Sequence, residues 1–213
     1  MNGGGPVVVA VTGASGAIHA HRLVEVLLEA GHEVFLVASA TGRRIIREEL
    51  PALAHPETVF RFAGPRSPRV FSERDFGAPF ASGSFRFRGM AVVPASMGTV
   101  GAIASGVSLN SIHRGADVAL KERRPLVLVP RETPLSAVHL ENLLKLARAG
   151  AVVLPACPAF YQRPASVAEQ VDFVVSRVLD HLGIENRLYR RWKEEPAEPA
   201  PGLAEGGADA EGR

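Results

Sequence analysis

The residues of this chain that could do chemistry follow short apolar runs. Residues 12–16, "TGASG", come after "VVVAV", and residues 96–99, "SMGT", come after another such run. Turns of this kind offer backbone amides and hydroxyls that can hold a phosphate at the start of a helix. Arg131 and Glu132 follow "LVLVP" and add a guanidinium for anions and a carboxyl group for proton transfer. The set predicts a site for a phosphorylated ligand.

The first of these turns limits the type of nucleotide. It lacks the lysine of a triphosphate-binding Walker A loop, which excludes that class. A dinucleotide fold would need a third glycine where His19 stands and an acidic residue where Ser39 ends the second apolar run. Tyr189 and Lys193 have the Y-x-x-x-K spacing of short-chain dehydrogenases, but they follow the last predicted helix, so we interpret the match as coincidence.

Bulk composition excludes several other functions. The chain has 213 residues, 46% of them hydrophobic, which predicts one large domain. A net charge of +2 without a long basic cluster argues against nucleic acid binding. The only cysteine, Cys157, cannot form an intrachain disulfide, and the histidines lack metal-site spacing. Without a membrane-length apolar run or a signal peptide, we expect a cytoplasmic protein that binds neither metal nor membrane.

The elements that must position these residues alternate between strands and helices. Continuous apolar runs predict buried strands at residues 7–11, 34–38, 90–93, 126–129 and 151–154. Helical periodicity predicts helices at residues 17–30, 41–50, 110–122, 136–149 and 167–182, with a small-residue helix after residue 96. This order predicts an α/β fold: a single flavodoxin-like (Rossmann-like) doubly wound parallel sheet with helices on both faces. Ligands of such sheets bind at the carboxyl edge of the strands.

Two stretches differ from the rest in composition. Residues 52–89 are rich in Pro, Gly, Ser and Arg, which predicts loops and one short strand near residues 69–71. Residues 194–213 are rich in Pro, Ala, Gly and Glu and cannot bury a core, so we expect a disordered tail. The predicted domain is therefore residues 1–193.

A family resemblance appears when the motifs are taken together. The segments are "TGASGA", "PASMGTVGAIASGVSLN", "RGADVALKERRPLVLVPRETPLSAVHLENLLKLARAGAVVLPACPAFY" and "DFVVSRVLDHLGI". They resemble the UbiX-type flavin prenyltransferases from about residue 7 to Trp192. The resemblance implies transfer of a dimethylallyl group from dimethylallyl phosphate to N5 and then C6 of reduced FMN, without a metal. It also implies a homododecamer with active sites at subunit contacts, and prenylated FMN as the product, used by UbiD-type decarboxylases.

The resemblance also implies roles for individual residues. The predicted FMN contacts are Gly13, Ala14, Ser15, Ser39, Ser96, Met97, Gly98, Thr99 and Arg131. The predicted contacts of the prenyl donor are Tyr161, Arg177 and Lys121, with Arg114 as a weaker companion and Trp192 near the prenyl group. The predicted catalytic residues are Glu132, Lys121 and Ser15. For Glu132 we hypothesise a protonated acid that donates to the departing phosphate or relays a proton from N5.

Several alternatives remain open at this point. Ser39 can cap a helix, and Arg177 alone looks like the polar face of an amphipathic helix. An FMN-dependent cysteine decarboxylase would need P-x-M-N where the chain has "PASM" without a following Asn. An FMN-binding carrier or assembly subunit would not need a second phosphate site. One departure from the family is His19-Ala20, where members commonly show Tyr-Gly.

Overall fold

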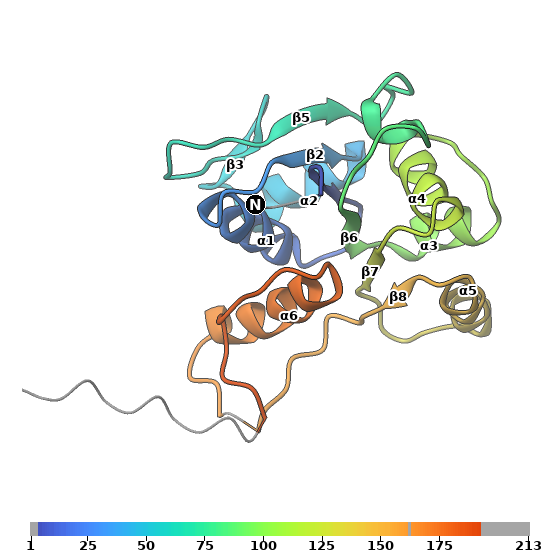
Figure 1. Cartoon of the computed structure of the whole chain (residues 1–213). Helices are drawn as coiled ribbons and strands as arrows, with labels where there is room; N and C mark the ends of the chain where they lie inside the picture. The colour runs from blue at the N-terminus through green and yellow to red at the C-terminus, as the bar shows by residue number, and fades with distance from the viewer. Residues whose placement is uncertain (1–3, 162, 193–213) are drawn as a thin grey trace, which may run out of the picture.

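A computed structural model describes residues 4–161 and 163–192 of the chain (Figure 1). The tail predicted at residues 194–213 lies outside the described residues. Along the chain the elements are β1 (Val7–Val11), α1 (Ala17–Glu29), β2 (Val34–Ala38), α2 (Ala40–Glu49), β3 (Ala54–His55), β4 (Val59–Phe60), β5 (Arg69–Ser72), the 3-10 helix η1 (Pro79–Ala81), β6 (Gly89–Ala95), α3 (Met97–Ala104), α4 (Ser111–Lys121), β7 (Leu126–Pro130), α5 (Ala137–Arg148), β8 (Val152–Val153) and α6 (Val167–His181).

Six strands form one sheet in the order β5-β2-β1-β6-β7-β8, and every pair in it is parallel. The chain builds outward from β1 in one direction and then from β6 in the other. This is the order of a Rossmann-like doubly wound sheet, and its switch point lies between β1 and β6. The predicted fold class is confirmed.

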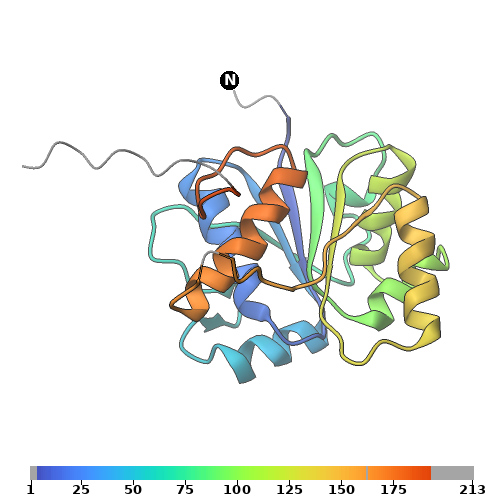
Figure 2. The same cartoon turned by 90° about the horizontal axis from the view of Figure 1, so that it is seen from below.

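The helices cover both faces of the sheet (Figure 2). Val7, Val9 and Val11 of β1 pack in one core with α1, α2 and α6, whereas Val8 and Ala10 pack in a second core with α3, α4 and α5. All five residues of β1 are fully buried. Burial on both sides explains why the strand reads as a continuous apolar run rather than an alternating one.

Most of the helices begin at a residue whose side chain caps them. Ser39, Ser96, Asn110, Ser136 and Ser166 each accept a hydrogen bond from the backbone amide three residues ahead. Such caps satisfy amides that have no partner inside the helix. The helix starts therefore fall within one or two residues of the sequence prediction, and Ser39 does cap α2.

Residues 52–89 contain more structure than their sequence indicates. The predicted strand near residues 69–71 is present as β5, which pairs with β2. The prediction missed the β3–β4 hairpin and η1, since strands of two residues carry no periodic pattern. Val59 and Phe60 of the hairpin are nonetheless buried in the core beside α1 and α2.

Two properties of the described residues bear on the compositional predictions. None of their helices combines the length and the apolar character needed to cross a bilayer. They contain no group of three or more His, Cys, Asp or Glu side chains arranged to hold a metal ion.

Candidate functional site

The switch point is held together by Thr12, which is buried at the end of β1. Its Oγ1 donates a hydrogen bond to the carbonyl oxygen of Pro94 at 2.8 Å and accepts one from the amide of Ser96 at 2.8 Å. A single hydroxyl therefore joins the turn after β1 to the turn after β6. The two predicted flavin-binding turns lie side by side for this reason.

Three helices, α1, α2 and α3, start at this carboxyl edge. The turn after β1 approaches α2 closely, because a Cβ on Gly13 would lie 2.5 Å from Cγ2 of Thr41. Ser96 Oγ accepts from the Thr99 amide at 3.4 Å and donates to Thr99 Oγ1 at 3.1 Å, while Met97 is buried against the core. Helix N-termini carry partial positive charge, so their convergence favours an anionic ligand.

Arg131 connects the end of β7 to the same turn. Its Nε donates a hydrogen bond to the backbone oxygen of Ser15 at 3.2 Å, across 116 positions of sequence. Glu132 follows it on the surface, where one carboxylate oxygen accepts from the Thr133 amide at 3.0 Å. The sequence predicts Ser15, Arg131 and Glu132 at the carboxyl edge of the sheet. In the structure Arg131 and Ser15 are joined by this hydrogen bond.

Glu49 is a site residue that sequence reasoning missed. Gly16, the N-cap of α1, has no side chain to cap the helix. The carboxylate of Glu49 accepts hydrogen bonds from the amides of Gly16 and Ala17, both at 2.9 Å. An uncapped glycine at a helix start is a signal that another group must serve its amides. The result is a carboxylate directly beside Ser15.

Glu73 serves the N-terminus of α2 in a similar way. Its carboxylate accepts from the Ala40 amide at 2.7 Å, next to Ser39. Carboxylates thus already neutralise the starts of α1 and α2. The start of α3 has only the Ser96 and Thr99 hydroxyls and no acidic residue in its first turn. Among these three helix starts, that of α3 accepts a phosphate with the least electrostatic opposition.

Lys121 and Arg114 both lie on α4, and Lys121 lies far from this edge in the topology. Lys121 ends α4, and a short turn then leads to the first residue of β7, so this lysine lies at the amino edge of the sheet. It pairs with Glu122, whose pKa it lowers. Arg114 pairs with Asp117 at 2.6 Å and donates to the Ala81 backbone oxygen at 3.1 Å. A single subunit does not bring Lys121 to the carboxyl ends of the strands. Arg114 instead lies in the first turn of α4, where Ser111 donates a hydrogen bond to the backbone oxygen of Ser72 at the end of β5.

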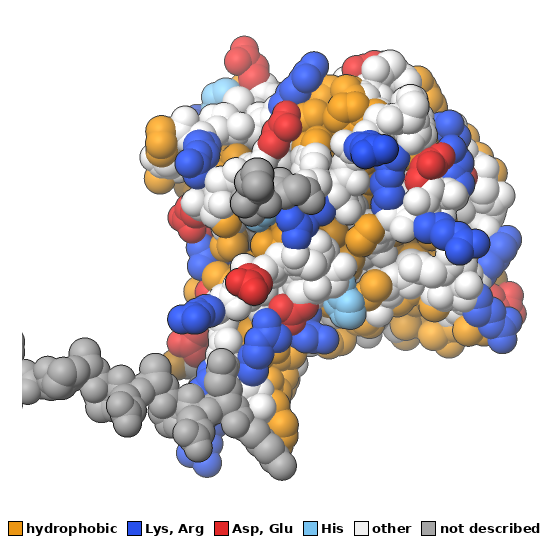
Figure 3. Space-filling model, viewed as in Figure 1, with side chains coloured by type: hydrophobic (Ala, Val, Ile, Leu, Met, Phe, Trp, Pro, Cys, Tyr) orange, Lys and Arg blue, Asp and Glu red, His pale blue; other side chains and the backbone are white. Residues whose placement is uncertain are grey.

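The other predicted donor contacts gather at a corner beside α6. The rings of Tyr161 and Trp192 meet edge-on with centroids 4.9 Å apart, and Tyr161 also contacts Phe173 at 6.4 Å. Both side chains are exposed, Tyr161 by 43% and Trp192 by 66%. Basic and hydrophobic side chains lie next to each other at this corner in Figure 3.

Arg177 points its charge at Asp180 in the same corner. The Arg177 and Arg191 guanidiniums donate to the Asp180 carboxylate at 2.8 Å and 2.7 Å. Burial opposes ionisation of Asp180, but the hydrogen bond and charge of Arg191 and the charge of Arg177 outweigh it and hold its pKa below the ordinary value. Arg177 is therefore already partly neutralised within the subunit.

The comparisons with known proteins now decide the family. The family model described as Flavoprotein matches residues 1–182. A protein named Flavin prenyltransferase UbiX from Methanothermobacter thermautotrophicus is 48% identical over 186 residues, which cover 87% of this chain and 94% of that protein. The chain belongs to the flavin prenyltransferases of this family.

Solved structures agree with this assignment of a flavin prenyltransferase. AnUbiX (PadA1), in complex with FMN and dimethylallyl pyrophosphate, is 42% identical with a TM-score of 0.83, covering 90% of this chain and 99% of its own. A dodecameric FMN-dependent UbiX-like decarboxylase from Escherichia coli O157:H7 is 39% identical with a TM-score of 0.78, covering 89% and 100%. The predicted family is confirmed, whereas the individual site residues stay predictions.

Proposed function

We propose that this flavin prenyltransferase transfers a dimethylallyl group from dimethylallyl phosphate to reduced FMN and so makes prenylated FMN. The observation that carries the proposal is the switch-point edge, where Thr12 joins two phosphate-type turns and Arg131 contacts Ser15. An AnUbiX structure with FMN and a dimethylallyl donor supports the substrate class.

The residues at this edge fit FMN. The start of α3, with Ser96, Met97, Gly98 and Thr99, offers hydroxyls and amides for the phosphate without a competing carboxylate. The ring system and its side chain would be held by residues of the neighbouring strand ends: Gly13, Ala14, Ser15, Ser39 and Arg131. Reduced flavin supplies the nucleophilic N5 and C6 atoms, and the protein must orient them toward the prenyl carbon.

The donor-phosphate site that we propose combines residues of two copies of the chain. Lys121 lies at the amino edge of the sheet, while Ser15 and Glu132 lie at the carboxyl edge. The E. coli UbiX-like protein is dodecameric. We therefore assign Lys121, with Arg114 as its weaker companion on α4, to the donor phosphate of a neighbouring subunit's site, within a homododecamer. Tyr161 and Arg177 would bind the same phosphate, and Trp192 would face the prenyl group.

We assign the proton transfer to the carboxyl group of Glu132. The bond between the prenyl carbon and the phosphate oxygen breaks as the bond to N5 forms and N5 loses its proton. In the second step one carbon of the prenyl double bond bonds to C6, the other carbon takes up a proton, and C6 releases its own proton. A protonated Glu132 would donate to the departing phosphate, and a proton released at N5 would restore it. Lys121, Tyr161 and Arg177 would stabilise the negative charge that develops on that phosphate. Ser15 would orient the flavin edge, and Glu49 fixes the turn that carries it.

The product would then leave for a second enzyme. Prenylated FMN is a cofactor rather than an end product, so a UbiD-type decarboxylase is the recipient we propose. With one cysteine and no expected metal, the chain suits the reducing cytoplasm.

Anaerobic mass spectrometry of the flavin tests this function. Protein loaded with FMN is reduced and incubated with dimethylallyl phosphate or, in parallel, with the diphosphate, and the extracted flavin is weighed. We expect a mass increase of one five-carbon prenyl unit, and we expect the extract to activate an apo UbiD-type decarboxylase. Unmodified FMN with both donors would contradict the proposal and favour an FMN carrier. Loss of carbon dioxide from a cysteinyl peptide would favour the cysteine decarboxylase instead.

A further inference from the structure

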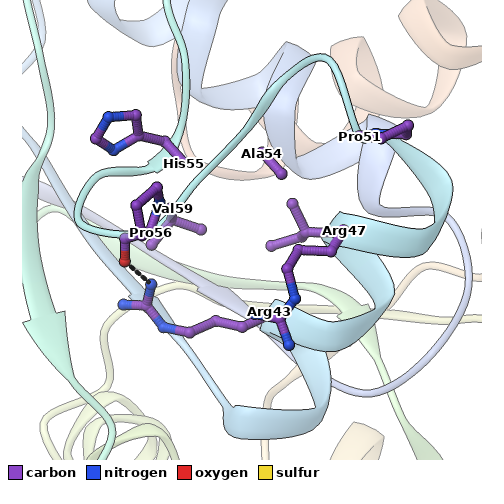
Figure 4. A pocket seen from close by; sticks show the side chains of 8 residues that line it. Arg43, Arg47, Pro51, Ala54, His55, Pro56 and Val59 are labelled. Carbon is purple, nitrogen blue, oxygen red and sulfur yellow. Dashed lines mark hydrogen bonds between the residues drawn. The ribbon is translucent and has the colours of Figure 1, made fainter.

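A cavity of about 440 Å³ lies outside the flavin edge, between α2 and the β3–β4 hairpin (Figure 4). Its apolar walls are formed by Ile46, Pro51, Ala54 and Val59. This volume falls in the range of small-molecule sites, which are typically apolar with a few well-placed polar groups.

Two guanidiniums and the imidazole of His55 supply the polar groups of this cavity, and His55 Nδ1 already accepts from the Thr58 amide at 3.1 Å. Arg43 and Arg47 stand one helical turn apart on α2, and both line the cavity (Figure 4). Arg43 is held by a hydrogen bond from its Nη1 to the backbone oxygen of Pro56 at 3.0 Å. Within the described residues Arg47 forms no hydrogen bond or ion pair. Its donors are directed to neither a carboxylate nor a carbonyl of the described chain.

The acidic residues of α2 do not neutralise this pair. Glu48 pairs with Arg44 on the outer side of the helix at 3.6 Å. The carboxylate of Glu49 instead accepts hydrogen bonds from the amides of Gly16 and Ala17. Glu57 in the hairpin loop is exposed and does not line the cavity. The cavity therefore combines apolar walls with two positive charges that the nearby carboxylates leave largely uncompensated.

The cavity is distinct from the predicted flavin site although both use α2. Thr41 packs against Gly13 of the flavin turn, whereas Arg43 and Arg47 face the hairpin. Ser39 lies at the start of α2, and the cavity extends along its later turns to Pro51. A ligand here would leave the flavin turn unblocked.

We propose that this cavity is a second ligand site, which binds a small amphiphilic anion: a phosphate monoester or carboxylate on a short apolar chain. Arginine pairs such head groups through two parallel hydrogen bonds, and Arg47 has the donors available. The apolar walls remove the chain from water, so a free phosphate would gain only part of the binding energy. The proposal does not depend on prenyl transfer.

Calorimetry on the FMN-loaded full chain carrying Lys121→Ala tests this site, because FMN then fills the flavin edge and the substitution weakens the proposed donor-phosphate site. Hexyl phosphate and hexanoate are the two anionic probes, and hexanol and inorganic phosphate carry the chain and the head group separately. We expect saturable binding of at least one anionic probe, at least about tenfold weaker binding of hexanol and inorganic phosphate, and an Arg47→Gln variant weakened by about tenfold. Arg44→Gln removes the same charge from the outer side of α2 and should bind like the parent.

Three results would overturn the proposal. Equal binding by Arg47→Gln and Arg44→Gln would overturn the proposal, as would the absence of binding by both anionic probes. Inorganic phosphate that binds as tightly as hexyl phosphate would reduce the site to a surface anion contact and also overturn it. Thermal melting of both variants shows that each is folded, and Arg43→Gln provides a second test on the other guanidinium.

Discussion

The flavin edge and the donor-phosphate residues are organised in opposite ways. At the flavin edge, Thr12, Arg131 and Glu49 connect segments far apart in sequence through hydrogen bonds within one subunit. The donor-phosphate cations instead have local acidic partners: Lys121 pairs with Glu122, and Arg177 with Asp180. The flavin half of the proposed site is therefore assembled within one subunit, whereas the donor-phosphate half is not.

This difference indicates that FMN binding and prenyl transfer depend on different groups of residues. A preorganised edge can bind FMN in each subunit without further change. Cations paired with local carboxylates are exposed and screened, and such surface pairs contribute little to stability. In the proposed site they become effective when a second subunit brings them to the donor phosphate. We expect substitutions at the flavin edge to weaken FMN binding, and substitutions of the donor-phosphate residues to impair prenyl transfer without weakening FMN binding.

The largest effect is expected from Glu132→Gln. The amide keeps the shape of the side chain but cannot transfer a proton, so turnover should fall by a factor on the order of 10²–10⁴. FMN affinity, measured by fluorescence titration, should stay close to that of the parent chain. Turnover that remains unchanged would remove Glu132 from the proposed chemistry.

Arg131→Gln should affect the opposite property. It removes the guanidinium that contacts the Ser15 turn, and we expect FMN binding to weaken by about ten- to a hundredfold. At saturating FMN most of the turnover should return. A variant that binds FMN normally but stays inactive would place Arg131 with the donor phosphate and break the comparison.

Lys121→Ala should leave FMN binding intact and raise the KM for the prenyl donor by about tenfold or more. Arg123→Gln, two residues away on the same exposed turn, is the matched control and should behave like the parent. Weakened FMN binding by Lys121→Ala would argue that this lysine belongs to the flavin edge after all.

The sequence alone predicts part of this site. Thr12, Ser39, Ser96 and Arg131 follow strands that read as continuous apolar runs, and parallel strands bring their ends to one edge. Glu49 escapes because its partners are the amides of another helix, 33 and 32 residues away, and no local pattern records that contact.

The position of Lys121 shows the other limit of sequence reasoning. The family resemblance implies a phosphate contact for this lysine, but α4 runs away from the carboxyl edge, so only the topology shows that this lysine is distant from Ser15 in its own subunit. The β3–β4 hairpin was missed because its strands contain two residues each. That omission also hid the cavity beside Arg47.

Thr12→Val tests the preorganisation of the flavin edge through stability. Valine has a similar shape but leaves the Ser96 amide without its partner, and we expect about 1–3 kcal/mol lower free energy of unfolding. Thr12→Ser retains the hydroxyl and should lose much less. Urea denaturation followed by circular dichroism measures both, and equal stability of Val and Ser variants would contradict the role given to this hydroxyl.

The smallest effect is a pH dependence of stability. Burial lowers the pKa of His19 and of His113 from 6.5, and the charges of Glu49 and Glu73 only partly oppose it. The unfolded chain then binds more protons than the folded one as the pH falls through 6.5, so the free energy of unfolding should decrease from pH 7.5 to pH 5.5. His113→Gln should show a shallower decrease in the same urea titrations, and an identical slope would contradict the assignment.

Complementation between subunits tests the central claim most directly. Lys121→Ala and Glu132→Gln chains are co-expressed and purified as mixed assemblies, and prenylated FMN is quantified by mass spectrometry at a donor concentration far below the raised KM of Lys121→Ala, where each variant alone has low activity. If the site combines Glu132 of one copy with Lys121 of another, random mixing at equal amounts leaves roughly a quarter of the sites intact, with that share of the parent activity. Mixed assemblies no more active than the separate variants would show that both residues serve one subunit's site, contradicting this account.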